Sequence, residues 1–371
     1  MTTTMNVVFC GGGTAGHVSP MLAMAEALQH RYSETDITLD ILMIGTAEGM
    51  EATLIPDAGY RFQTVDKVPM PRSLSRDLMA VPLRLRRAIK QARKLLREHG
   101  TQVVVGVGGY AATPVYLAAR AEKIPVIVHE GNVRPGLANR LAARFASVVA
   151  CAFANTDLPG AIHVGMPMRT EITELPTGPT MQTQARRSLG LEPDKTTLVV
   201  TGGSSGAVNI NNAVAGAVHD LLATDAQILH LTGRDKVVTD DEGQAITLPG
   251  YKQVEYIDGL ALVYQAADLI VARAGAGTVH ELAAIGIPSV LVPLPIGNGE
   301  QELNAADLHE HGAAVVVPDA QFTSQWVATR LPNLLRDQPR LTYMAQTAKH
   351  LGIPDAAETM ATIISETKVA R

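Results

Sequence analysis

The sequence predicts an α/β fold of two doubly wound, Rossmann-like domains that face each other across a cleft. The chain has 371 residues, which is too long for one ordinary domain and suits two. Short runs of β-branched residues alternate with segments of helical periodicity, a pattern typical of parallel sheets covered by helices on both faces. The alternation pauses at 176–184, a polar segment rich in Pro, Gly and Thr, and then starts again. The second half therefore repeats the architecture of the first.

The expected strands form two series, one on each side of this pause. Those of the first half are 6–10, 37–45, 102–109, 124–130 and 146–150. Those of the second half are 196–203, 226–233, 268–275 and 288–295. We expect a first domain at 1–168 and a second at 169–347, with the helical segment 348–371 packed back onto the first domain. Ligands of doubly wound domains bind at the carboxyl ends of the strands, so we expect the chemistry in the cleft between the domains.

Composition excludes several classes of function. The chain is 46% hydrophobic and 18% charged, with a net charge of -5, so nothing suggests nucleic acid as a partner. Cys10 and Cys151, the two cysteines, are far apart and lack the spacing of a zinc site or a disulfide framework, which fits a reducing cytoplasm. The N-terminal apolar run has no basic flank and is expected to be a strand rather than a signal peptide. The longest uncharged stretch, 101–119, is interrupted by glycines and Pro114, so no transmembrane helix is expected.

Two glycine-rich loops join a strand to a helix, at 11–16 and at 202–207. Glycines at such a turn let backbone N–H groups approach a phosphate, and the helix N-terminus adds positive potential. One loop per half suggests two phosphorylated ligands. The alternative, tight packing of helix on strand, needs only one or two of these glycines. A third cluster, Gly106 to Tyr110, also follows a strand and either faces the same cleft or serves as a turn. The candidate acceptor and phosphate loop residues are Gly13, Gly108, Gly109 and Tyr110.

The first loop contains G-x-G-x-x-G at Gly11, Gly13 and Gly16, which raises the alternative of an NAD-dependent oxidoreductase. That class of enzyme needs an acidic residue at the end of the second strand, about 20 residues after the last glycine. The second strand instead ends in Gly45 and Thr46. The ribose-binding acid is missing from its expected place.

Six motifs, in order along nearly the whole chain, resemble those of the MurG family. They are GGGTAGHVSP at 11–20, GVGGYAATP at 106–114, HEGN at 129–132, GGSSGAVNIN at 202–211, RAGAGTVHELAAIGIPSVLVPLP at 273–295 and NGEQELNA at 298–305. That family consists of transferases of the GT-B fold that make lipid II in peptidoglycan synthesis and cell wall biogenesis. The sequence departs from the common pattern at Gly131, Arg134 and Ser205, which bears on the finer contacts.

The resemblance implies a UDP-N-acetylglucosamine donor on the second domain and a lipid-linked muramyl-pentapeptide acceptor at the first. It implies that Ser204 binds the donor diphosphate, that the main chain of Ile257 meets uracil, that Glu281 accepts from the ribose hydroxyls and that Gln301 binds the sugar. The full set of implied donor-binding residues is Thr14, Ala15, Gly16, Asn132, Arg169, Ser204, Ile257, Ala276, Gly277, Thr278, Val279, His280, Glu281 and Gln301. Arg169 has the alternative of being a surface charge at a domain hinge.

As the family implies, His17 is the candidate base that deprotonates the C4 hydroxyl of the muramyl sugar, giving inversion and a β-1,4 linkage. A histidine titrates near the working pH and suits this role. The alternative is that His17 only hydrogen-bonds the loop or the acceptor diphosphate. His129 and Glu130 form a second acid/base pair near the cleft, and His129 is more readily structural. No Asp-x-Asp motif is present to hold Mg²⁺, so we expect no protein-bound metal and no other cofactor.

The segment 71–97 carries nine basic residues against one acid, Asp77, in a chain of negative net charge. Its apolar residues recur at roughly helical spacing, so it predicts either a basic amphipathic helix on an anionic membrane surface or a surface helix whose apolar stripe is core. The first alternative suits a peripheral enzyme at the cytoplasmic face of the cell membrane. Other GT-B enzymes, such as a lipid glucosyltransferase or a UDP-N-acetylglucosamine epimerase, and a non-catalytic nucleotide-sugar binding protein remain open at this point.

Overall fold

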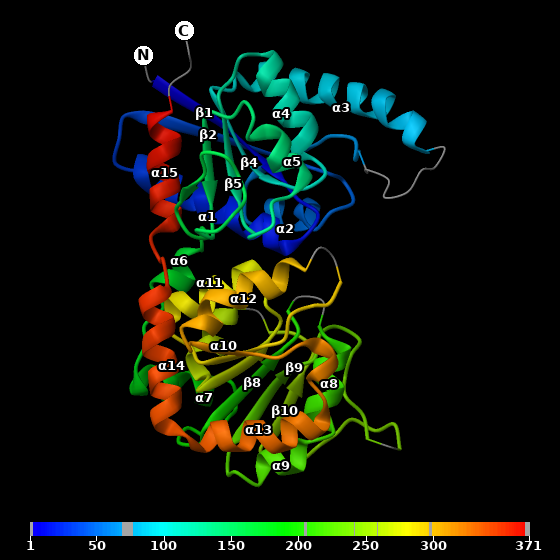
Figure 1. The fold of residues 1–371 in the computed structure, drawn as a ribbon. Coiled ribbons are helices and arrows are strands. Elements are labelled where there is room, and N and C mark those ends of the chain that lie inside the picture. The colour runs from blue at the N-terminus through cyan, green and yellow to red at the C-terminus, as the bar shows by residue number, and fades with distance from the viewer. Residues whose placement is uncertain are drawn as a thin grey trace. The chain divides into compact units, whose positions relative to one another are not determined.

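The computed structural model describes residues 3–68, 77–203, 206–240, 242–257, 259–296 and 299–367, with the backbone alone at Thr3, Ala15 and 77–80. The chain divides into two compact units. The first unit comprises Met1–Arg169 with Pro354–Arg371, and the second comprises Thr170–Ile353. Each unit contains one parallel sheet with helices packed on it (Figure 1). The predicted α/β class with two parallel-sheet domains is confirmed.

The first unit is built on a seven-stranded sheet in the order β3-β2-β1-β4-β5-β6-β7. In chain order its strands are β1 (Thr3–Gly11), β2 (Ile37–Gly45), β3 (Arg61–Thr64), β4 (Val103–Gly108), β5 (Val126–Glu130), β6 (Val148–Cys151) and β7 (Ile162–His163). Its helices are α1 (Ala15–Tyr32), α2 (Glu51–Asp57), α3 (Asp77–His99), α4 (Ala112–Ala121), α5 (Leu137–Ala142) and α15 (Ala356–Glu366).

Successive residues of β1 supply the two faces of this sheet. Val7 and Phe9 belong to a core that also holds apolar residues of α1 and α15, whereas Val8 and Cys10 belong to a core with α3 and α4. All four side chains have no exposed surface. The apolar run predicted at 6–10 is thus explained, because both faces of a doubly wound sheet are covered.

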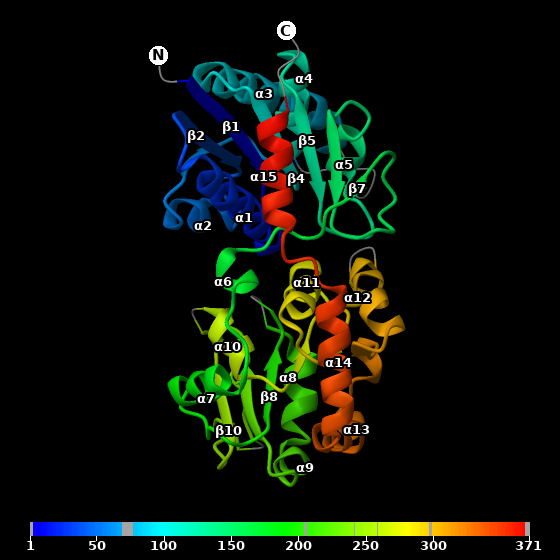
Figure 2. The same cartoon turned by 90° about the vertical axis from the view of Figure 1, so that its left-hand side faces the viewer.

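Helix α15 completes the core of the first unit, although it follows the second unit in the sequence. Figure 2 shows it lying across the front of the first unit beside α1. Its apolar residues Met360 and Ile364 are fully buried in the same core cluster as Met24 of α1. At the helix surface, Arg31 donates to Thr362 Oγ1 and Ser365 Oγ at 3.2 and 3.1 Å.

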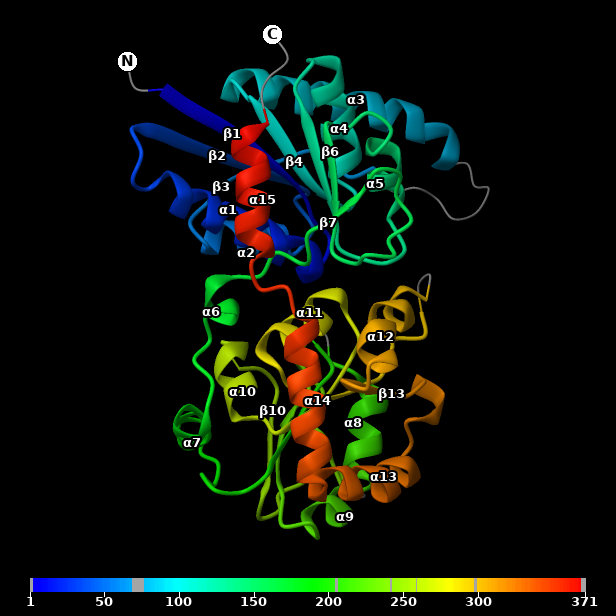
Figure 3. The ribbon, with the colours of Figure 1, turned by 60° about the vertical axis from the view of Figure 1, so that its left-hand side comes forward.

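The second unit is built on a six-stranded sheet in the order β10-β9-β8-β11-β12-β13. Its strands are β8 (Thr197–Thr201), β9 (Gln227–Leu231), β10 (Tyr251–Val254), β11 (Leu269–Ala272), β12 (Ser289–Leu291) and β13 (Ala314–Val316). Its helices, seen in Figure 3, are α6 (Thr170–Thr173), α7 (Pro179–Ser188), α8 (Val208–Ala215), α9 (Val218–Leu222), α10 (Leu260–Ala266), α11 (Ala276–Ile285), α12 (Glu300–Glu310), η1 (Asp319–Gln321), α13 (Ser324–Arg336) and α14 (Gln338–Leu351).

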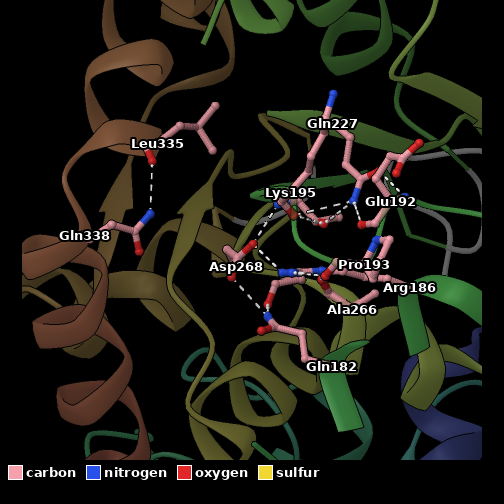
Figure 4. A network of polar contacts seen from close by, with 12 residues as sticks. Gln182, Arg186, Glu192, Pro193, Lys195, Gln227, Ala266, Asp268, Leu335 and Gln338 are labelled. Atoms are coloured by element: carbon pink, nitrogen blue, oxygen red, sulfur yellow. Dashed lines mark hydrogen bonds and ion pairs between the residues drawn. The ribbon is translucent and has the colours of Figure 1, made fainter. Parts of the chain in front are cut away.

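A buried ion pair ties the amino ends of β8 and β11 to α7 (Figure 4). Arg186 donates to Asp268 Oδ2 and also to the carbonyl oxygens of Ala266 and Pro193, both at 3.0 Å. The same carboxylate accepts the backbone N–H of Thr197 at the start of β8. Because each nitrogen of this buried guanidinium donates to an acceptor, the pair fixes the end of the sheet opposite to the carboxyl ends of the strands.

Candidate active site

In each sheet the strand order reverses at one point, and the glycine-rich loops lie there. In the first unit the reversal falls between β1 and β4, whose carboxyl ends lead into 11–13 and 108–109. In the second unit it falls between β8 and β11, whose carboxyl ends lead into 202–206 and 273–275. Ligands of doubly wound sheets bind at such reversal points. Each unit therefore carries one candidate site, built from two neighbouring loops.

The two loops of the first unit are in direct contact. A Cβ atom on Gly109 would lie 2.3 Å from the carbonyl oxygen of Gly12, so only glycine allows this approach. Gly109 also has φ +87, in the left-handed region. Gly13 is exposed beside them and Tyr110 is 48% exposed, with Lys67 Nζ 5.5 Å from its ring centroid. The third glycine cluster thus lies directly against the first loop.

His17 lies in the first turn of α1, directly after the first loop. Thr14 is the N-cap residue of this helix, and its hydroxyl lies 3.1 Å from Nδ1 of His17. Gly16 is exposed and His17 partly exposed, while Ala15 is described by its backbone alone. Burial lowers the pKa of His17 from its ordinary value, although the charges of Glu130 and Glu51 act in the opposite direction. The imidazole is therefore neutral at neutral pH, the state that a general base requires.

Glu51, the first residue of α2, is a component of this site that the sequence reasoning missed. Its side chain is fully buried, and Oε2 accepts the backbone N–H of Gly13 at 2.7 Å. Oε1 accepts from the backbone N–H and the hydroxyl of Thr46 at 3.0 and 2.8 Å. No motif marks Glu51, since its partners lie 5 and 38 residues away. The carboxylate at the start of α2 accordingly joins Thr46, which follows β2, to the first glycine loop.

A buried network of hydrogen bonds lies at the carboxyl end of β5. Oε1 of Glu130 accepts the backbone N–H of Asn132, and Oε2 accepts from Gly136 N–H and the Asn139 amide, each at 2.9 Å. His129 is fully buried, with Nε2 2.9 Å from the carbonyl oxygen of Gly165. This geometry favours the structural interpretation of both His129 and Glu130. Asn132 is partly exposed at the edge of the network.

Arg169, the last residue of the first stretch of this unit, is half exposed. Its Nε lies 4.0 Å from Oε2 of Glu26 on α1. An ion pair that is this long and exposed contributes little to stability. The geometry is consistent with either interpretation of this residue.

The glycine-rich loop of the second unit follows β8, and Ser204, with Ser205, lies outside the described residues. Of its glycines, Gly206 has φ +65, and a Cβ atom there would lie 2.3 Å from the carbonyl oxygen of Thr232. The loop closes through a hydrogen bond from Gly206 N–H to Gly203 O at 2.9 Å. The next helix, α8, then begins at Val208.

A buried chain of hydrogen bonds supports this loop from below. Asn211 of α8 donates to Thr232 O at 2.9 Å, and its Oδ1 lies 3.1 Å from Nε2 of His230. Nδ1 of His230 lies 2.9 Å from the hydroxyl of Tyr251. Burial lowers the pKa of His230 to about 4, so the imidazole in this series of hydrogen bonds is neutral at neutral pH. The position of Thr232, and hence of Gly206, depends on these three side chains.

Helix α11 begins at Ala276, beside this loop at the reversal point. Its first turns contain Ala276, Gly277, Thr278, Val279, His280 and Glu281. Nδ1 of His280 lies 2.8 Å from the carbonyl oxygen of Ala276, while Oε2 of Glu281 accepts the hydroxyl of buried Tyr264 at 2.6 Å. Burial raises the pKa of Glu281, a change that the Tyr264 hydrogen bond opposes. Tyr264 is a second site component without a sequence signal.

Gln301 and Ile257 lie on other loops of the second unit. Oε1 of Gln301, in the first turn of α12, accepts the backbone N–H of Leu294 at 2.9 Å. Arg273 holds the same stretch through Val292 O at 3.1 Å and through an ion pair with Asp319. Ile257 is partly exposed after β10, which β9 separates from β8 in the sheet order. The structure thus joins 276–281 with the glycine loop and leaves Ile257 farther along the edge of the sheet.

Within 3–68, 77–203, 206–240, 242–257, 259–296 and 299–367, no three or more His, Cys, Asp or Glu side chains are placed to hold a metal ion. In the same ranges no helix has the length and apolar character to cross a membrane.

Comparisons with known proteins agree over the whole chain. Residues 7–151 match the glycosyltransferase family 28 N-terminal domain, and residues 197–360 match the C-terminal domain of that family. A protein of Paenarthrobacter aurescens, named UDP-N-acetylglucosamine--N-acetylmuramyl-(pentapeptide) pyrophosphoryl-undecaprenol N-acetylglucosamine transferase, is 51% identical over 98% of this chain and 96% of its own. A relative of the same name from Acidothermus cellulolyticus is 44% identical over 99% of both chains.

Among solved structures, the crystal structure of Acinetobacter baumannii MurG aligns with a TM-score of 0.76 and 28% identity, over 98% of this chain and 100% of the other. UDP-GlcNAc 2-epimerase of Neisseria meningitidis aligns with a TM-score of 0.67 at 14% identity, over 98% of this chain and 100% of the other, and so shares the fold alone. With a near full-length relative at 51% identity and both family domains in place, the chain belongs to glycosyltransferase family 28 and, within it, to the MurG family of N-acetylglucosamine transferases.

Proposed function

We propose that the protein is an inverting glycosyltransferase that converts lipid I to lipid II. It moves N-acetylglucosamine from UDP-N-acetylglucosamine to the C4 hydroxyl of undecaprenyl-diphospho-muramyl-pentapeptide. The observation that carries the proposal is the 51% identity, over almost the full length of both chains, with a relative whose name states this transfer. The glycine loops at the reversal point of each sheet support it, because donor and acceptor both carry a diphosphate.

The donor site is proposed at the reversal point of the second sheet. Ser204 and backbone N–H groups at the start of α11 bind the diphosphate, and the positive end of the helix dipole stabilises the charge of departing UDP. Glu281 accepts from the ribose hydroxyls, Ile257 meets uracil through its main chain and Gln301 binds the sugar. The remaining proposed donor contacts are Thr14, Ala15, Gly16, Asn132, Arg169, Gly277, Thr278, Val279 and His280.

The acceptor diphosphate is proposed at the loops of the first unit, with Gly13, Gly108, Gly109 and Tyr110. His17 acts as the base. With its Nδ1 proton donated to Thr14 Oγ1, Nε2 carries the lone pair that takes the proton of the C4 hydroxyl. O4 then forms a bond to the anomeric carbon as the bond from that carbon to UDP breaks on the opposite face. The product is a β-1,4 linkage, and the electron pair of the broken bond leaves with UDP.

The same proposal places the enzyme at the cytoplasmic face of the cell membrane, bound through α3. Ala88, Ala92 and Leu96 are buried against the core of the first unit, so the C-terminal part of the apolar stripe is core, as the second alternative for this helix expected. Leu83 is 67% exposed near the other end of the helix. The exposed basic residues of the described part are Arg84, Arg86, Arg87, Lys90, Lys94 and Arg97. Anionic lipid is the partner that such a face attracts.

The test is transfer of label from radiolabelled UDP-N-acetylglucosamine into the lipid fraction, with a lipid-linked muramyl-pentapeptide as acceptor and UDP-glucose in parallel. We expect selective transfer from UDP-N-acetylglucosamine that falls by at least about a hundredfold in His17→Ala, the size of effect typical of a lost general base. Glu281→Ala is expected to weaken donor binding instead. Hydrolysis or epimerisation of the donor, without label in the lipid, would contradict the proposal and favour another enzyme of the same fold.

A further inference from the structure

The carboxylate of Glu51 is surrounded by hydrogen-bond donors only. Oε2 accepts Gly13 N–H, and Oε1 accepts the N–H and the hydroxyl of Thr46. Burial raises the pKa of Glu51, but these hydrogen bonds outweigh it and hold the pKa below its ordinary value. The group is therefore a buried anion at neutral pH, a costly arrangement unless every lone pair is used in this way.

The chain makes room for this anion with glycines. Cβ atoms on Gly12 and Gly49 would lie 2.3 and 2.0 Å from oxygen atoms of Glu51, and one on Gly45 would lie 2.5 Å from its Cγ. Two stretches that are distant in the sequence, the first glycine loop and the connection from β2 to α2, thus close around one carboxylate. This close packing holds the carboxylate in a single position. The loop at 11–14 is held with it, because Gly13 N–H is bound to the carboxylate.

The loop held in this way leads directly into the first turn of α1, which carries His17. Gly13, which donates to Glu51, precedes Thr14, and Thr14 both caps α1 and contacts Nδ1 of His17. Two carboxylates of the described first unit act on the charge of His17, namely Glu51 from α2 and Glu130 from the end of β5. Glu130 is bound to the turn after β5, whereas Glu51 is bound to the loop of His17 itself.

From this geometry we infer that Glu51 is a positioning residue of the transfer reaction. Its carboxylate fixes the loop at 11–14, directs His17 Nδ1 toward Thr14 and supplies a negative charge that stabilises the protonated imidazole. The inference rests on the proposed function, in which His17 is the base. The base needs such a charge, because the desolvation of His17 favours the neutral imidazole and weakens its affinity for the proton.

The direct test is the titration of His17 by NMR, using protein labelled with ¹³C at histidine Cε1 and His17→Ala to assign the resonance. In Glu51→Gln the loss of the negative charge is expected to lower the pKa of His17 by about half a pH unit, as for a charge at intermediate distance in a protein. Glu48→Gln is the matched control, because Glu48 lies three residues before Glu51 in the connection from β2 to α2, is 76% exposed and pairs with Lys67. The pKa of His17 in Glu48→Gln should equal that in the unchanged protein.

Kinetics give the second readout. Glu51→Gln is expected to lower kcat at least about tenfold with KM for UDP-N-acetylglucosamine unchanged, and to move the acidic limb of the pH profile to lower pH. Glu51→Asp keeps the charge and should restore part of kcat. Loss of activity with an unchanged His17 titration would mean that Glu51 only stabilises the fold, and would overturn the inference.

Two further results separate the possible failures. If Glu51→Gln does not fold, Thr46→Val removes one hydrogen bond to the carboxylate and keeps its charge, so kcat should fall several-fold with the donor KM unchanged. An unchanged kcat in folded Thr46→Val would overturn the inference. If the unchanged protein transfers no sugar, the proposed function fails, while the titration still decides whether Glu51 and His17 are coupled.

Discussion

At the scale of single residues, the pair of Glu281 and Tyr264 is expected to make donor binding depend on pH. Burial raises the pKa of Glu281, the Tyr264 hydroxyl lowers it and the charge of Glu171 raises it. The proposed contact with the ribose hydroxyls needs an acceptor, which the ionised carboxylate is. Donor affinity is therefore expected to fall as the pH drops through the raised pKa of Glu281.

Removing the Tyr264 hydroxyl should move this transition to higher pH. Tyr264→Phe deletes the one interaction that lowers the pKa of Glu281, so the protonated form persists to higher pH. Isothermal titration of UDP-N-acetylglucosamine between pH 5 and 8 measures it. Tyr343→Phe is the control, because Tyr343 is 59% exposed on α14. The same pH dependence in Tyr264→Phe and in the unchanged protein would show that Glu281 does not bind the donor as a carboxylate.

His230 makes the stability of the second unit depend on pH. Its pKa is about 4 in the folded state, below the ordinary value of about 6.5, so the unfolded chain binds the proton more tightly. The contribution of neutral His230 to the free energy of unfolding is complete above pH 6.5 and is lost as the pH falls toward 4. At pH 5 the loss is about 2 kcal/mol. Urea unfolding at pH 7 and pH 5 measures this difference. In His230→Gln the drop in the free energy of unfolding from pH 7 to pH 5 should be smaller by that amount. A drop equal to that of the unchanged protein would contradict the prediction.

Residues were predictable where a local pattern marks them and not where the fold creates the contact. Thr14 and His17 follow a strand and a glycine loop, so their place at a helix start could be read from the sequence. Glu51 and Tyr264 meet their partners only after distant segments pack together, 38 and 17 residues away. No spacing rule reports such contacts, because they depend on which strands become neighbours.

At the scale of elements, the buried strands were predicted well and the edge strands were missed. The strand expected at 37–45 is β2 with the same bounds, and those at 102–109 and 124–130 shorten by a few residues. β3, β7, β10 and β13 were not predicted, and each has four residues or fewer. Edge strands lack neighbours on one side and need no continuous apolar run, so their sequences carry little signal.

Helix α3 supports a prediction about membrane binding. Replacing four exposed basic residues, Arg86, Arg87, Lys90 and Lys94, by Gln should weaken binding to phosphatidylglycerol vesicles at least about tenfold, since each such charge near an anionic surface contributes about 1 kcal/mol. Vesicle sedimentation measures the bound fraction. The control removes four exposed charges of the second unit, Arg187, Arg330, Arg340 and Lys349. Equal binding by both variants would exclude α3 as the membrane contact.

At the scale of the whole molecule, the fold class was predictable because the alternation of strands and helices is repeated on both sides of 176–184. The place of the C-terminal helix was expected from length alone. In the structure the chain leaves the first unit after Arg169 and returns to it at Pro354. The second unit is continuous in sequence, and the first is not.

This discontinuity predicts that removing 354–371 harms one unit only. Deletion takes Ala357, Met360, Ala361 and Ile364 out of the first core, a loss on the order of 4 kcal/mol from the two larger side chains alone. Hydrogen exchange read by mass spectrometry should show lost protection in α1 and β1 and unchanged protection in β8 and β11. Retained protection in α1 would mean that α15 does not stabilise the first unit.

The discontinuity of the first unit also affects the order in which the two units can fold during translation. Domains usually fold as they emerge, N-terminal first, but the first unit lacks α15 until almost the whole chain has been translated. The second unit has every residue it needs before α15 is synthesised. Nascent chains therefore carry an incomplete first unit with the apolar face of α1 uncovered, which is the kind of surface that chaperones bind. Translation that stops before Pro354 leaves a product that contains the whole second unit and a first unit without α15.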